Sequence, residues 1–187
     1  MYIKLIAIIL FSFLYGFFEL LLGIRQKNKL QVVKSGDKRS TWILIISIGY
    51  YLSFLVGSTK IGRIYHWDAF FVIGAIMITI GLIIRISAIL TLKKQFTYTV
   101  TKLVDHELIE TGMYKLIRHP AYLGQLIIFT GLAVTLSNWL SIIIMLVSVL
   151  SGYLYRINIE EKFMAEQIGQ NYINYKKRTK RLIPGIY

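Results

Sequence analysis

The amino-acid sequence predicts an all-α integral membrane protein with about five transmembrane helices. Hydrophobic residues make up 56% of the 187 residues and charged residues only 17%, whereas soluble domains average about 45–50% apolar and about 25% charged residues. The chain also contains several apolar runs that approach the 20 or so residues needed to cross a bilayer. Only two prolines interrupt the chain, which favours long helices. These observations place the protein in the membrane class.

Five apolar runs are the predicted spans. The first run resembles a signal peptide, but basic residues follow it and no small-x-small cleavage site does, so we interpret it as an uncleaved helix. The last two runs are separated only by Ser137 and Asn138, which predicts an antiparallel hairpin. Tryptophans stand at several predicted span ends, as in an aromatic belt. The runs cover residues 5–24, 42–56 (extendable to 59), 69–92, 122–136 and 139–155.

The distribution of basic residues predicts the orientation of these spans. The formal net charge is +13, and 19 of the 22 lysines and arginines lie in segments 25–41 and 85–121 and in the tail from 156. Cytoplasmic loops carry such an excess, so we expect the N-terminus outside, with the C-terminus and any active site in the cytoplasm. The charge then reflects topology and contact with membrane lipids, and we expect no nucleic-acid partner.

We expect residues 1–187 to form a single membrane domain, without internal repeats. Within it, residues 1–60 supply two N-terminal helices that carry no recognised motif, and residues 69–187 carry the chemistry. The chain has no cysteine and only three histidines, so we expect no disulfide and no metal site. The tail 163–187 is basic and aromatic, which is typical of an interfacial amphipathic helix.

The chemistry-bearing residues gather in two predicted cytoplasmic stretches. In segment 93–120, Thr111-Gly112 predicts a turn, and residues 100–109 predict a short helix or strand. His119-Pro120 predicts a helix start, where free backbone N–H groups can hold an anion. In segment 155–166, Arg156 and Glu160 are four residues apart and share a helix face. A surface ion pair is the simpler interpretation, but charges at the edge of the hydrocarbon are often functional.

Two charged residues lie inside predicted spans. Glu19 is near the cytoplasmic end of the first span and Arg85 near that of the third. They either pair with each other or extend separately toward the interface. We expect a structural role for both rather than a catalytic one.

Several motifs in the second half of the chain occur in a characteristic order, split by the predicted hairpin. With them, the chain resembles the isoprenylcysteine carboxyl methyltransferase family, whose wider relatives include phospholipid methyltransferases. One family position departs, because the glutamine expected shortly before His106 is Thr99 here, with Gln95 nearby. The matching segments are 106–109 (HELI), 111–114 (TGMY), 118–124 (RHPAYLG), 156–161 (RINIEE), 169–175 (GQNYINY) and 183–184 (IP).

The resemblance implies S-adenosylmethionine as the methyl donor, bound by the cytoplasmic C-terminal half. No strand followed by G-x-G-x-x-G occurs in the sequence, so a Rossmann site is not expected. Arg156 matches the family's substrate-binding arginine and is our candidate catalytic residue. The residues that match the family's cofactor contacts are His106, Glu107, Leu108, Ile109, Tyr114, His119, Pro120, Ala121, Tyr122 and Glu160.

Methyl-ester formation on an isoprenylcysteine, or on a similar lipid-linked carboxylate, is the first functional hypothesis. A carboxylate is already ionised at neutral pH, so no general base is needed. Methylation of a phospholipid amine, or of a lipid-like phenol or enol oxygen, is the alternative, and it would need a base such as His106. A non-enzymatic transporter is disfavoured because the spans lack polar or glycine- and proline-rich interruptions. The sequence predicts no oligomeric state.

Overall fold

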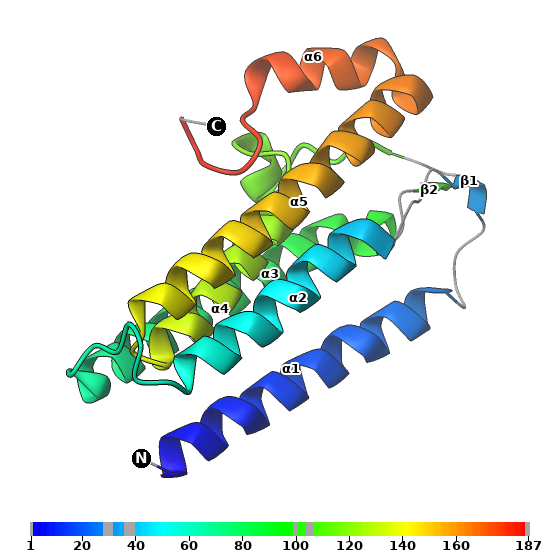
Figure 1. The fold of residues 1–187 in the computed structure, drawn as a ribbon. Coiled ribbons are helices and arrows are strands. Elements are labelled where there is room, and N and C mark those ends of the chain that lie inside the picture. The colour runs from blue at the N-terminus through cyan, green and yellow to red at the C-terminus, as the bar shows by residue number, and fades with distance from the viewer. Residues whose placement is uncertain (1, 28–31, 36–39, 99–100, 104–106, 186–187) are drawn as a thin grey trace.

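The computed structural model describes residues 2–27, 32–35, 40–98, 101–103 and 107–185. Most of this chain forms helices that run side by side, with a short two-stranded antiparallel ribbon at one end (Figure 1). The helices are α1 (Tyr2–Lys27), α2 (Ser40–Gly57), α3 (Trp67–Leu92), α4 (Pro120–Thr135), α5 (Trp139–Ile168) and α6 (Gln170–Arg178). Shorter elements are η1 (Lys93–Gln95), η2 (Gly112–Lys115), β1 (Val32–Ser35) and β2 (Thr101–Leu103).

The predicted spans coincide with helices α1 to α5, apart from Leu136, which caps α4, and the possible extension past Gly57. Among the described residues, three helices are long and apolar enough to cross a membrane, namely α1, α3 and α5. Helices α2 and α4 are apolar but shorter. The structure thus confirms the helical membrane class, and the number of five crossings stays a prediction.

Glycines bring α3 and α4 into backbone contact. A Cβ atom added at Gly124 would lie 2.7 Å from the Arg85 nitrogen and 2.8 Å from the Gly81 carbonyl oxygen. One added at Gly131 would lie 2.9 Å from the Gly74 carbonyl oxygen. Small residues allow such close approach of helices in membranes, where packing rather than hydrophobic burial drives association. The close contact fixes the start of α4 beside Arg85.

The α4–α5 turn is the predicted hairpin. Asn138 is fully buried and caps α5, because its side-chain oxygen accepts a hydrogen bond from the Ser141 nitrogen at 3.1 Å. Its Nδ2 donates to the Ile61 carbonyl at 2.7 Å. The turn is therefore tied to the α2–α3 connection at the end of the bundle opposite the ribbon.

Glu19 and Arg85 form an ion pair, which was the first of the two predicted arrangements. The Arg85 guanidinium donates to Glu19 twice, from Nε to Oε1 at 3.2 Å and from Nη2 to Oε2 at 3.0 Å. The Tyr98 hydroxyl donates to the same carboxylate. Only 2% of the Arg85 side chain is exposed, so this ion pair lies within the protein and ties α1 to α3.

The end of the bundle near α6 carries the predicted turn and helix start. Gly112 has φ +58, in the left-handed region that favours glycine. His119 is the N-cap of α4, with Pro120 in its first turn. The chain after α6 returns here, because the Arg118 nitrogen donates to the Lys180 carbonyl at 2.8 Å and the His119 nitrogen to the Arg181 carbonyl at 3.0 Å. Part of segment 100–109 is strand β2, and residues 104–106 lie outside the described residues.

Candidate active site

A cavity opens at this end of the bundle, and most of the predicted cofactor residues line it. It encloses about 1070 Å³ of space, its open mouth included. Pro120 is not on its wall but begins α4, and His106 lies outside the described residues. The predicted residues on the wall are Glu107, Leu108, Ile109, Tyr114, His119, Ala121, Tyr122 and Glu160.

Arg156 is held behind this wall. Only 2% of it is exposed. Its Nη2 donates to the Tyr98 carbonyl at 3.0 Å, and its Nε lies 3.4 Å from the Tyr122 hydroxyl. Its guanidinium carbon sits 5.4 Å from the centre of the Trp42 ring. The residues that hold Arg156 line the cavity, while Arg156 itself is one layer further back.

Tyr122 links the two charged residues that the sequence placed on one helix face. Its hydroxyl donates to Glu160 Oε2 at 2.8 Å and lies within reach of Arg156. Its ring stacks on His119 on one side and on Tyr153 on the other, with centroids 5.6 Å and 5.0 Å away. A row of three rings therefore fixes the position of Glu160 on the cavity wall.

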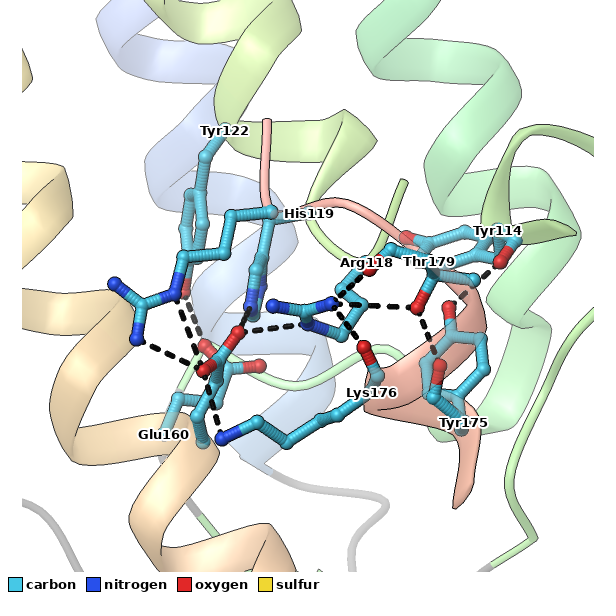
Figure 2. A network of polar contacts seen from close by, with 10 residues as sticks. Tyr114, Arg118, His119, Tyr122, Glu160, Tyr175, Lys176 and Thr179 are labelled. Atoms are coloured by element: carbon cyan, nitrogen blue, oxygen red, sulfur yellow. Dashed lines mark hydrogen bonds and ion pairs between the residues drawn. The ribbon is translucent and has the colours of Figure 1, made fainter. Parts of the chain in front are cut away.

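A buried carboxylate, Glu161, organises the cations around the cavity. Figure 2 shows Arg118, His119 and Lys176 pointing toward the same region beside Glu160. The Glu161 oxygens lie 2.8 Å from Arg118 Nε, 3.4 Å from His119 Nε2 and 3.2 Å from both Lys176 Nζ and Arg181 Nη2. Only 2% of Glu161 is exposed. Because a buried charge is costly without partners, this cluster holds the start of α4, α5 and α6 together.

Tyrosine hydroxyls near the cavity act as donors rather than bases. Burial, followed by the negative charge of Glu160, raises the pKa of the Tyr114 phenol above its usual value. Burial likewise raises the pKa of Tyr175, whose hydroxyl donates to the Tyr114 carbonyl at 2.7 Å (Figure 2). Both phenols remain neutral at physiological pH, so neither is available as a base.

A second cavity adjoins the first between the helices. It encloses about 1040 Å³, open space included. Glu19 is one of its lining residues, and side chains such as Ile43, Ile46 and Phe129 give it a largely apolar wall. The residues that line both cavities, and thus form the wall between them, are Trp42, Tyr98 and Gln125.

Comparison with known proteins decides the family. Residues 69–171 match the family model described as phospholipid methyltransferase. The chain belongs to the phospholipid methyltransferase family. The match covers α3 to the start of α6, and thus includes the helices that carry most of the cavity wall.

Two similar curated proteins are both named protein-S-isoprenylcysteine O-methyltransferase. Over 150 residues the chain is 32% identical to protein-S-isoprenylcysteine O-methyltransferase B of Arabidopsis thaliana. The aligned region covers 79% of this chain and 75% of the relative. The chain is 36% identical to the Dictyostelium discoideum enzyme of that name over 62% of this chain. The chain spans only 49% of that second relative.

A solved structure has the same fold. The eukaryotic intramembrane Ras methyltransferase, isoprenylcysteine carboxyl methyltransferase, superposes with a TM-score of 0.63 and 27% identity. The match covers 80% of this chain and 55% of that protein. Together with the apolar helices, these matches establish this methyltransferase as an integral membrane protein.

Sequence reasoning missed several residues of this methyltransferase that lie at the cavity. Glu161 is next to Glu160 in a motif, but its partners come from distant parts of the chain. Trp42 begins a predicted span, a position that indicates an aromatic-belt residue rather than a site residue. Gln95, near Thr99 in the sequence, is buried and lies on the wall, whereas Thr99 itself lies outside the described residues.

Proposed function

We propose that this chain transfers a methyl group from S-adenosylmethionine to the carboxylate of an isoprenylcysteine, or of a similar lipid-linked acceptor, and forms a methyl ester. The pair of adjoining cavities carries the proposal. One is lined by charged and polar groups, the other is largely apolar, and they share the wall formed by Trp42, Tyr98 and Gln125. This arrangement suits an acceptor with a charged end and a long apolar chain. The names of the relatives support the same acceptor.

The residues on the polar wall fit a zwitterionic cofactor with apolar parts. On this proposal, Glu160 accepts hydrogen bonds from the ammonium group of the cofactor. His119, at the N-terminus of α4, meets its carboxylate. Leu108 and Ile109 offer apolar contact. S-adenosylmethionine, when bound, supplies an electrophilic methyl group on a sulfonium sulfur.

On this proposal the protein contributes charge and orientation rather than a base. The acceptor carboxylate is ionised at neutral pH. Arg156 supplies a fixed positive charge close to the wall between the cavities, where low polarity strengthens its attraction for an anion. The tyrosines that stay neutral leave the acceptor's charge undisturbed. Catalysis then consists of holding the carboxylate oxygen in line with the methyl group, which orientation alone accelerates greatly.

The N-terminal helices have a place in this proposal. We assign residues 69–187 the methyltransferase core and residues 1–60 a wall of the acceptor cavity, within one membrane domain. Tyr15 and Glu19 of α1 and Ile43 and Ile46 of α2 line the apolar cavity. The lipid chain would enter it from the bilayer, with the polar cavity on the cytoplasmic side and the N-terminus outside.

The family model is described as phospholipid methyltransferase, which favours a phospholipid amine as the second candidate acceptor. Purified protein in detergent is to be incubated with labelled cofactor and, separately, a farnesylated cysteine acid, phosphatidylethanolamine and a lipid phenol. We expect label in a base-labile methyl ester of the farnesylated cysteine. Label in the phospholipid or phenol alone would overturn the carboxylate proposal and establish the alternative.

A further inference from the structure

Trp42 occupies the boundary between the two cavities. It lies in the first turns of α2, a helix with no recognised motif, and it is half-buried. Its side chain lines both the polar and the apolar cavity. An acceptor whose charged end lies in one cavity and whose chain lies in the other would therefore lie beside this ring.

Two features of the ring point to a role in binding. One face lies against the guanidinium of Arg156, 5.4 Å from the ring centre, in a cation–π contact. The indole N–H is buried and has no hydrogen-bond partner among the described residues. Buried tryptophan N–H groups usually find an acceptor, so a bound molecule with an acceptor atom is the natural partner here.

Trp67 resembles Trp42 in its contacts but not in its position. It also lies under an arginine, with Arg63 5.6 Å from the ring centre, and its N–H is also buried without a described partner. It starts α3 and lines neither cavity described above. A lone indole N–H is therefore not a site by itself. The distinguishing features of Trp42 are the cavity wall and Arg156, the candidate acceptor arginine.

Trp42 also offers a donor to an anion at this wall. Of the residues that line both cavities, Tyr98 already donates its hydroxyl proton to Glu19. Gln125 accepts from Tyr153 with its side-chain oxygen at 2.8 Å, which leaves its amide NH2 group as a further, uncharged donor. The indole N–H of Trp42 has the positive charge of Arg156 against its ring, and this charge favours a negatively charged partner over a neutral one.

We propose that Trp42 is an acceptor-binding residue, whose indole N–H donates a hydrogen bond to the acceptor carboxylate while its ring holds Arg156 in place. The inference rests on the proposed function and adds one contact to it. It assigns to the N-terminal pair of helices a direct part in recognising the charged end of the acceptor, as well as its lipid chain.

The test replaces the indole by a ring without an N–H. Trp42→Phe keeps an aromatic face for Arg156 but removes the donor. We expect the KM for a farnesylated cysteine acid to rise by about tenfold, the effect of one lost hydrogen bond to a charged group. The dissociation constant of the cofactor, measured by calorimetry, should not change. Trp67→Phe, the matched control, should leave both values unchanged.

An unchanged acceptor KM in an active Trp42→Phe protein would overturn the inference and leave the proposed function standing. Absence of methyl transfer by the wild-type protein would overturn both. A double variant, Trp67→Phe with Trp139→Phe, leaves Trp42 as the only tryptophan and tests the contact without altering it. We expect the Trp42 fluorescence to change saturably when the farnesylated cysteine acid is added, and to respond more weakly to the methyl ester of that acid. Equal responses to the acid and the ester would also overturn the inference.

Discussion

At the scale of single residues, the site depends on hydroxyl and ring contacts that connect charges. Tyr122 joins Glu160 to Arg156 through one oxygen atom and stacks between His119 and Tyr153. The carboxylate is thereby held on the wall while the guanidinium is held behind it. We expect their roles to separate in the same way, with Glu160 acting on the cofactor and Arg156 on the acceptor.

Glu160→Gln should weaken cofactor binding even without acceptor. The amide keeps the size of the side chain but loses the negative charge that would meet an ammonium group. A hydrogen bond to a charged group contributes about 1.5–3 kcal/mol, so the affinity should fall by roughly ten- to a hundredfold, as measured by calorimetry. Glu166→Gln, an exposed change on the same helix, is the control. Equal affinities for both variants and wild type would remove Glu160 from the cofactor site.

Arg156→Lys should lose much of the activity while cofactor binding survives. A lysine ammonium is a point charge and cannot reproduce the planar fork that reaches Tyr98 and Tyr122 and covers the Trp42 ring. Rates of methyl-ester formation and calorimetric cofactor affinity are the two measurements. Retained activity with lost cofactor affinity would reverse the assignment.

The pH dependence of the wild-type rate should be flat from about pH 6 upward, because a carboxylate acceptor titrates near 4. An amine or phenol acceptor needs a base, so its rate would rise through the pKa of that base. Rates at saturating substrate between pH 5 and 9 distinguish the two. A rising limb between about pH 6 and 8 that His119→Ala or His106→Ala abolishes, with cofactor still bound, contradicts a carboxylate acceptor.

At the scale of helices, the sequence predicted the features that are determined by residues close together in the chain. Apolar runs gave the positions of α1 to α5, and His119-Pro120 gave the start of α4, because span length and helix initiation are local properties. The contacts of Glu161 with Lys176 and Arg181, and of Trp42 with Arg156, join distant segments that no periodicity relates. The interfacial position of the tail stays a prediction, and the burial of Tyr172 and Tyr175 of α6 on the cavity wall is a further contact between distant segments.

Gly124→Ala should destabilise the α3–α4 pair. The added methyl group would lie 2.7 Å from the backbone nitrogen of Arg85, and backbone cannot move aside as a flexible side chain can. Such overpacking costs about 1–3 kcal/mol, so thermal unfolding in detergent should occur at a lower temperature. Gly16→Ala in α1 meets nothing within 4 Å and should not lower it. Equal melting temperatures for Gly124→Ala and wild type would contradict the close packing.

At the scale of the whole molecule, the ribbon and α6 lie toward the same end of the bundle (Figure 1). The first cavity belongs to this end, because Tyr114 of η2 and Tyr175 of α6 line it. The α4–α5 turn and the α2–α3 connection form the opposite end. The asymmetry of basic residues predicts that the first end faces the cytoplasm.

A topology reporter tests the assignment directly. Fused after Tyr187 it should report the cytoplasm, and inserted near Gly62, in the α2–α3 connection, it should report the outside. Protease accessibility of the tag in sealed vesicles is the measurement, with retained methyl transfer as the control for folding. Both reporters on one side of the membrane would contradict the model with five spans.

The pairing of Arg118 and His119 with the backbone of Lys180 and Arg181 has a consequence for biosynthesis. Helices α4, α5 and α6 are all made between these two partners. The apolar helices can therefore enter the membrane before the segment that completes the polar cavity has left the ribosome. During this interval the newly inserted bundle has its lipid-facing parts but lacks the backbone partners of His119. A nascent chain would thus gain its catalytic competence as a late, separate event after membrane insertion.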